Sequence, residues 1–318
     1  NTGLSKDSRG VTVWNSHNLE LTDSDIQVSG TTNTNKEMSV FIGNSNDVLL
    51  ENLITNNIGA SDESIGVWIS NSHDCELLDS DIEVTGTNNT NKEISVHVSG
   101  NSLRVLLDNL ITKNSGISDE SVGIWLDDAD IGVLTNSSIL VAGSTNTNLE
   151  TSVLVDNGSN LVQLSNLSIV HAGASTSSRG ISILSATNTN ISNCTVNIYT
   201  NSTNTETFSN AMFVQFSTGV KVTDSYFYEA SNAKYSDVID VVDLSHNFRI
   251  SNSVCENNAT GSPTERRCFR INGSNSDTIS NCIISSQYAY TSTPTPSSFT
   301  NAVVFLDNNN DPVVMNNQ

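Results

Sequence analysis

Aromatic side chains recur at a fixed place in a series of short apolar segments. The segments read VTVWN at 11–15, MSVFI at 38–42, IGVWI at 65–69, ISVHV at 94–98 and VGIWL at 122–126. Each fits a β-strand, in which alternate side chains point to opposite faces. Their fourth residues are predicted to face outward and to form the candidate ligand-binding set: Trp14, Phe41, Trp68, His97 and Trp125. Aromatic faces repeated along a surface suit stacking on the rings of a glycan chain.

The second residues of these segments, and of two further ones, are small. The same alternation predicts that this column also faces outward: Thr12, Ser39, Gly66, Ser95, Gly123, Ser152 and Ser182. A track of small residues beside the aromatic stripe would leave room for the glycan. The alternative is that a loop or a neighbouring subunit covers the stripe, which would then be a packing surface.

Carboxylates lie just before the same segments. They are Glu37, Glu63, Glu93, Glu120 and Glu150, with Asp62 and Asp119 alongside. Acids stacked at close spacing repel one another, which raises a pKa or recruits Ca²⁺, and the calcium candidates are Asp62, Glu63, Asp119 and Glu120. An acid beside an aromatic groove also suits glycoside cleavage, so Glu63, Glu93 and Glu120 are candidate catalytic residues. We favour a solvated acidic turn without a cofactor, partly neutralised by Lys36 and Lys92.

A second acidic run supplies one more candidate catalytic residue, Asp240. It lies between Asp237 and Asp243, with His246 and Arg249 further along the chain. Strand alternation predicts that the three aspartates lie on different faces, so we do not expect them to converge. The chain contains no Gly-x-Ser-x-Gly sequence and no phosphate-binding loop.

Internal repeats indicate what positions these side chains. Residues 64–93 echo residues 9–37, and residues 105–121 echo residues 48–64, which gives a period of 56–57 residues. Each period holds two shorter repeats of the form apolar-x-[Asn/Asp]-x-x-apolar. The first apolar residue of each is Leu21, Leu49, Leu77, Leu106, Leu134, Leu164, Ile191, Val222, Ile250 and Ile279. The polar slot two places on is predicted to be a ladder of turns.

A coil of about 28 residues cannot bury its apolar face alone, and stacking such coils creates a continuous core with parallel hydrogen-bonded ladders. The sequence therefore predicts an all-β fold, a right-handed parallel β-helix (β-solenoid) of about eleven coils. It is predicted to be a single domain over residues 1–318, with a loop insertion at 255–268 and a long loop at 285–300.

Two copies of the short repeat, ISNCTV at 191–196 and ISNCII at 279–284, resemble the I-x-N-C-x-I repeats of the pectate-lyase-like parallel β-helix superfamily. This resemblance covers nearly the whole chain and implies the fold, which hosts many functions. Polygalacturonase-like members carry clustered aspartates, a His-Gly and an Arg-x-Lys. This chain has Asp127 next to Asp128 but neither of the other two motifs. Pectate-lyase-like members use an Arg or Lys base beside calcium-binding acids, and the central coils hold very few basic residues.

These departures favour a structural or adhesive surface module, one that forms filaments or binds glycans, over an enzyme. The alternative is a polysaccharide lyase or glycoside hydrolase of the tailspike or pectinase type. The formal charge of −21 disfavours nucleic acid as a partner, because such binding relies on Lys and Arg. No apolar run is long enough for membrane insertion. We expect a secreted, extracellular or cell-surface protein that associates end to end, because neither end of the chain shows a cap.

The cysteines and glycosylation sequons add smaller predictions. Cys255 and Cys268 bracket the loop insertion and could close it with a disulfide. Among the Asn-x-Ser/Thr sequons, those in predicted loops are the glycosylation candidates: Asn88, Asn201, Asn258 and Asn272.

Overall fold

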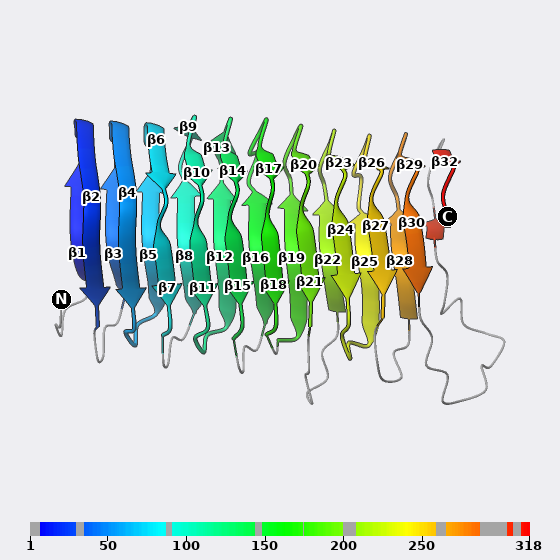
Figure 1. Ribbon diagram of the computed structural model, residues 1–318, viewed down its shortest axis with the longest axis horizontal. Helices are drawn as coiled ribbons and strands as arrows, with labels where there is room; N and C mark the ends of the chain where they lie inside the picture. The colour runs from blue at the N-terminus through cyan, green and yellow to red at the C-terminus, as the bar shows by residue number, and fades with distance from the viewer. Residues whose placement is uncertain are drawn as a thin grey trace.

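The computed structural model describes residues 7–29, 35–86, 91–143, 148–173, 175–199, 208–258, 265–286, 304–307 and 313–318. Every regular element in these ranges is a β-strand, so none of them is a helix of the length and apolarity that a membrane crossing needs. The strands wind into a rod whose successive coils lie side by side along its long axis (Figure 1). The predicted all-β parallel helix is confirmed.

One long side of the rod is an 11-stranded parallel sheet, here called sheet A, which agrees with the predicted number of coils. Its strands are β1 (Asp7–Trp14), β3 (Lys36–Gly43), β5 (Glu63–Ser70), β8 (Lys92–Ser99), β12 (Glu120–Asp127), β16 (Leu149–Asp156), β19 (Ser177–Leu184), β22 (Phe208–Gln215), β25 (Tyr235–Val242), β28 (Glu265–Asn272) and β31 (Val304–Asp307).

The other sides form a 21-stranded sheet, here called sheet B. Its strands are β2 (His17–Val28), β4 (Asn46–Asn57), β6 (His73–Leu78), β7 (Asp81–Val84), β9 (Ser102–Leu103), β10 (Leu106–Asp108), β11 (Ile111–Asn114), β13 (Ala129–Asp130), β14 (Val133–Thr135), β15 (Ser138–Val141), β17 (Gln163–Ser165), β18 (Ser168–His171), β20 (Asn190–Ser192), β21 (Thr195–Ile198), β23 (Lys221–Thr223), β24 (Tyr226–Glu229), β26 (Arg249–Ser251), β27 (Val254–Asn257), β29 (Thr278–Ser280), β30 (Ile283–Ser286) and β32 (Val313–Met315).

The core runs the length of the rod between the two sheets. In the eight-residue strands of sheet A the fifth and seventh residues point inward, as Val40 and Ile42 do, and they pack against inward residues of sheet B such as Leu50. Stacked Val, Ile and Leu side chains remove a continuous column of apolar surface from water, which is the main stabilising contribution in such a repeat.

The polar slot of the short repeat is a turn ladder, as predicted, but its register differs in two coils. Asn52 and Asn109 occupy the left-handed turn conformation there, with φ of 52° each, and Asn52 donates to Asp23 of the coil before it. The paired sheet residues are accordingly Leu50 and Leu107 rather than Leu49 and Leu106. The shift of one residue turns Ile54 and Ile111 outward, where both are 56% exposed.

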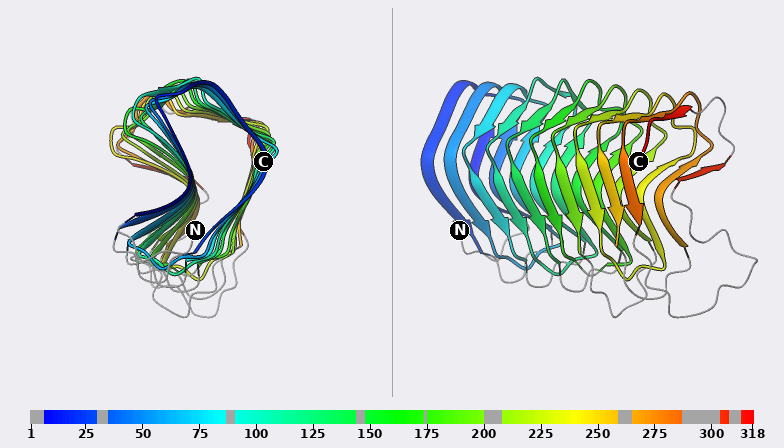
Figure 2. Two further views of the ribbon diagram at one scale, coloured as in Figure 1. Left: turned by 90° about the vertical axis from the view of Figure 1, so that its left-hand side faces the viewer. Right: turned by 45° about the vertical axis from the view of Figure 1, so that its right-hand side comes forward.

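The strands of sheet A bend inward near their middle, so the outer face of this sheet is concave (Figure 2, left). The fourth and fifth residues of each eight-residue strand of sheet A both face the interior, and this breaks the strict alternation. At Gly66 a Cβ atom would lie 2.5 Å from the side chain of Ile82 and from the carbonyl oxygen of Ser95, so only small residues fit. The third and sixth residues consequently both line the concave outer face, here called the outer groove.

The predicted loops are shorter than expected, because residues 255–257 belong to β27, residues 265–268 to β28 and residues 285–286 to β30. Residues 259–264 of the predicted insertion and residues 287–300 of the predicted long loop lie outside the described residues.

Candidate functional site

The outer groove has two halves of different chemistry on one continuous backbone frame. The apolar half lies on β3, β5, β8, β12 and β16, and the charged half lies on β19, β22, β25 and β28. In the apolar half the third and sixth residues of the strands are Met38 and Phe41, Ile65 and Trp68, Ile94 and His97, Val122 and Trp125, and Thr151 and Leu154. In the charged half they are Arg179 and Ser182, Asn210 and Phe213, Asp237 and Asp240, and Arg267 and Arg270.

The predicted aromatic stripe lies in the apolar half and points outward, but its rings stack on one another along the rod. The ring centre of His97 lies 5.5 Å from that of Trp68 and 4.6 Å from that of Trp125, and the ring planes of both stacked pairs are nearly parallel. Phe41 meets Trp68 edge to face at 5.2 Å. The ring faces are therefore occupied by neighbours, and this geometry favours packing over sugar stacking.

Trp14 departs from the predicted register. It pairs with Gly43 at the eighth position of the strand, whereas Thr12 pairs with Phe41. Its ring lies over Gly43, and it remains 53% exposed at the end of the stack, 5.7 Å from the ring of Phe41. The sequence comparison aligned VTVWN with MSVFI, but VTVWN begins at the fifth residue of β1 and MSVFI at the third residue of β3. The predicted register of the first coil is therefore wrong by two residues.

The predicted outward track of small residues is wrong for most of its members. Ser39, Gly66, Ser95, Gly123 and Ser152 occupy the inward fourth position at the bend. Simple alternation failed because two consecutive residues face inward there.

The acidic column that the sequence suggested divides into two columns on opposite faces. Glu63 and Glu120 lie at the outer rim and pair with lysines of the neighbouring coil, Lys36 at 2.6 Å and Lys92 at 2.9 Å. Each lysine also lies 4.7 Å from a tryptophan ring, Lys36 over Trp68 and Lys92 over Trp125. The rim acids are thus neutralised by cations.

The other acids of that column, Glu37, Glu93 and Glu150, are fully buried inside the rod, so Glu93 does not reach the groove. Glu150 lies 3.4 Å from the imidazole of His171. The backbone carbonyl oxygens of the calcium candidates Asp62 and Asp119 accept hydrogen bonds from backbone N–H groups of the next coil. Among the described residues, no three His, Cys, Asp or Glu side chains gather closely enough to hold a metal ion.

Ion pairs dominate the charged half. Arg267 forms a two-pronged pair with Asp237, in which Nη2 lies 2.9 Å from Oδ2, and both side chains are at most 6% exposed. Arg270 donates from Nη1 to Oδ2 of Asp240 at 3.3 Å. The expectation that the aspartates lie on different faces is wrong for Asp237 and Asp240. Two inward residues separate them at the bend, so both carboxylates line the groove.

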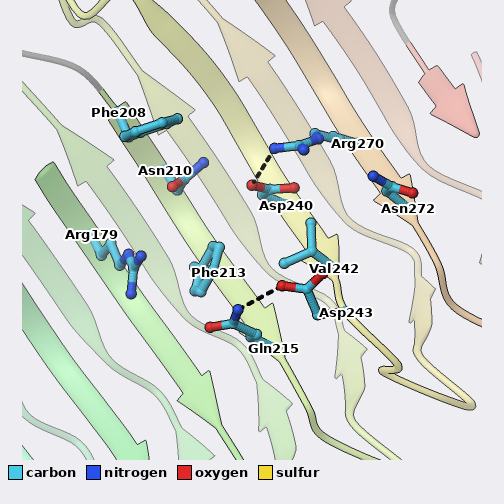
Figure 3. Close-up of a pocket in the computed structure, with 10 residues that line it drawn as sticks. All are labelled: Arg179, Phe208, Asn210, Phe213, Gln215, Asp240, Val242, Asp243, Arg270 and Asn272. Carbon is cyan, nitrogen blue, oxygen red and sulfur yellow. Dashed lines mark hydrogen bonds and ion pairs between the residues drawn. The ribbon is translucent and has the colours of Figure 1, made fainter. Parts of the chain in front are cut away.

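A cavity of about 280 Å³ opens in the charged half (Figure 3). Its lining consists of Arg179, Phe208, Asn210, Phe213, Gln215, Asp240, Val242, Asp243, Arg270 and Asn272. Arg179 packs its guanidinium 3.7 Å from the ring centre of Phe213. Gln215 donates to Asp243 at 2.7 Å. The lining combines ring faces, amides and charges, which together can bind a hydroxyl-rich ligand.

Burial controls the titration of this site. Burial and the neighbouring Asp237 raise the pKa of Asp240 to about 7, although Arg270, Arg267 and Arg179 act in the opposite direction. Burial lowers the pKa of Arg179 to about 10. A carboxyl group that titrates near neutral pH can exchange a proton under ordinary conditions. No simple sequence signal marked Arg179, which lies 61 residues from Asp240 and joins it only through stacking of the coils.

The predicted disulfide is not formed. Cys255 and Cys268 are free, buried thiols, as are the other three cysteines. Cys255 faces the core, and Cys268 donates to the carbonyl oxygen of Ser285 at 3.1 Å. Of the glycosylation candidates, Asn258 and Asn272 are described, and Asn88 and Asn201 lie outside the described residues. Asn272 lines the cavity.

No family model matches the chain, and no curated protein matches it. Among solved structures, it is similar to a double mutant of the periplasmic alginate epimerase AlgG, with 9% identity and a TM-score of 0.42 over 89% of this chain and 77% of that one. It is also similar to the A-module of the Azotobacter vinelandii mannuronan C-5 epimerase AlgE4, with 12% identity and a TM-score of 0.34 over 85% and 91%. A third likeness is to the tailspike of E. coli bacteriophage HK620 in complex with a hexasaccharide, with 10% identity and a TM-score of 0.34 over 88% and 71%. At these values the likenesses carry no conclusion about activity, and the fold rests on the chain's own strand topology.

Proposed function

We propose that the protein binds a glycan chain laid along the outer groove, with the cavity of the charged half as the main contact. The observation that supports this proposal is the cavity, where the exposed ring of Phe208, the buried ring of Phe213, several amides and two arginines converge. Hydroxyl groups need paired donors and acceptors, and sugar faces need aromatic surface. The rings of the apolar half stack on one another, and Phe208 also stacks on Tyr235, so the amides and charged groups are what make the charged half the better contact.

The test compares two exposed phenylalanines at opposite ends of β22. Phe208 lines the cavity and is 43% exposed, whereas Phe216 lies just beyond the strand, outside the cavity lining, and is 53% exposed. Binding of a panel of neutral and acidic oligosaccharides is measured by calorimetry. We expect Phe208→Ala to weaken binding about 3- to 10-fold, the value of one aromatic contact, and Phe216→Ala to leave it unchanged. Equal effects of the two substitutions, or no binding to any glycan, would overturn the proposal.

A second candidate function is cleavage of the bound glycan with Asp240 as acid or base. The observation that favours it is a buried carboxyl in the cavity whose pKa is raised to about 7 and which is paired with Arg270. Release of reducing ends by the intact protein, lost in Asp240→Asn, would support it. If the intact protein releases none, this candidate fails and the binding module remains.

The surface-display, adhesive and end-to-end filament roles, and a secreted or periplasmic location, are further parts of this proposal. A net charge of −21 opposes side-by-side association of rods and leaves axial contact as the favoured arrangement. Sedimentation of the intact protein over a range of concentrations tests the filament, and a mass independent of dilution that equals one chain would contradict it.

A further inference from the structure

Arg179 is a cation inside the groove, and no carboxylate of the described residues is in contact with it. Its guanidinium stacks on Phe213 and makes a long hydrogen bond of 3.5 Å to Ser182, and its Nε has no hydrogen-bond partner within the described part of the chain. The neighbouring arginines of the charged half differ, because Arg267 and Arg270 pair with Asp237 and Asp240. A half-buried guanidinium without an anion is costly unless a ligand supplies one.

Asp240 is the group that decides how strongly Arg179 attracts an anion. The two side chains line the same cavity from β19 and β25, with Phe213 of β22 between them, and their charges interact (Figure 3). Oδ2 of Asp240 accepts a hydrogen bond from Arg270, whereas Oδ1 has no hydrogen-bond partner among the residues that the structure describes. An ionised Asp240 repels an incoming anion, and a protonated one does not.

The charges around Asp240 fit a singly charged ligand. The ionisable groups that line the cavity are Arg179, Asp240, Asp243 and Arg270. The paired Asp237 and Arg267 lie beside them, and Glu229 and Arg266 lie buried on the inner side. With Asp240 neutral, two arginines against one aspartate leave one positive charge in the lining, and with Asp240 ionised the lining is neutral. One net charge suits a carboxylate better than a doubly charged phosphate.

We propose that the charged half binds a sugar carboxylate on Arg179, and that it does so with Asp240 protonated. This deepens the proposed glycan-binding function and rests on it. Binding is then linked to a proton, because only the fraction of molecules with a neutral Asp240 is competent. For a carboxyl that titrates at about 7, the apparent affinity falls about tenfold between pH 6 and pH 8.

The experiment uses the intact protein and a matched pair of probes. These are uronate octasaccharides and the same chains with every carboxyl reduced to a primary alcohol, titrated at pH 6 and pH 8. Asp240→Asn is expected to bind the uronate chain equally at both pH values. Arg179→Gln is expected to lose about 10- to 100-fold, the loss of a charge-assisted contact. The matched control is Arg249→Gln, an exposed arginine on sheet B.

The outcomes separate this inference from the function on which it rests. Equal binding of the two probes, or an affinity of the intact protein that is independent of pH, overturns the inference and leaves glycan binding intact. Binding of neither probe overturns both. If Arg179→Gln melts at a lower temperature, Arg179→Lys serves in its place, since it keeps the charge and is expected to retain part of the affinity and all of the pH dependence.

Discussion

The two halves of the outer groove share one backbone but hold their side chains by different forces. At the third strand position the apolar half has Ile65, buried against its neighbours, and the charged half has Asp237, buried in a pair with Arg267. The apolar half loses only contact area when one residue is removed. Removing one partner of an ion pair in the charged half leaves the other charge buried without compensation, which costs more free energy of unfolding. The comparison indicates that one half is built for packing and that the other carries polar groups which a ligand can use.

The largest expected effect follows from breaking the buried ion pair. Asp237→Ala should lower the free energy of unfolding by about 3–5 kcal/mol, because the Arg267 guanidinium stays buried without its carboxylate. Adding Arg267→Met should restore much of this loss. The matched change in the apolar half, Ile65→Ala, should cost about 2–4 kcal/mol with no such rescue. Urea unfolding measures all of these, and a cost below about 1 kcal/mol for Asp237→Ala would contradict the distinction.

Buried carboxyl groups lie inside the rod behind both halves, and pH should reveal the one behind the charged half, Glu229. Those behind the apolar half are Glu37, Glu93 and Glu150. One column inside the rod holds Asn57 and Asn114 behind the apolar half and Glu229 behind the charged half. Burial raises the pKa of Glu229 from its ordinary 4.5 to about 8. Between these values the folded protein holds a proton that the unfolded chain has released, so the free energy of unfolding falls as pH rises through this window.

Replacing Glu229 tests this linkage. Glu229→Gln should remove about 3 kcal/mol of the decline between pH 5 and pH 8 and should stabilise the protein at pH 8. Glu256→Gln, on the outer face of β27, is the control and should leave the profile in place. Unfolding midpoints at several pH values provide the measurement. If stability depends on pH in the same way with and without Glu229, this carboxyl is not the cause of the pH dependence.

The smallest expected effect concerns the stacked rings. Trp68→Ala and Trp125→Ala should each lower the free energy of unfolding by about 2 kcal/mol, less than a fully buried tryptophan, because both are partly exposed. Glycan binding in the charged half should be unchanged. Trp14→Ala, at the exposed end of the stack, should cost less than either. Variants that keep their stability and lose glycan binding would instead make the stripe the binding surface that the sequence predicted.

The sequence by itself determined the fold. The 56–57-residue period, the apolar positions such as Leu77 and Ile82, and the turn slot at Asp79 together require stacked coils, because no single coil buries its own apolar face. It also determined that Trp68, His97 and Trp125 share one outward column, since a period of two within a strand and a fixed spacing between strands leave little freedom.

Only the tertiary structure decided which of these residues can meet a ligand. The inward bend at Gly66 and its counterparts breaks strand alternation, and it brings Asp237 and Asp240 onto one face where periodicity had separated them. Stacking of coils then carries Arg179 into the same cavity from a distant part of the chain. Periodicity describes one strand at a time, whereas a binding site depends on the curvature of a sheet and on contacts between coils.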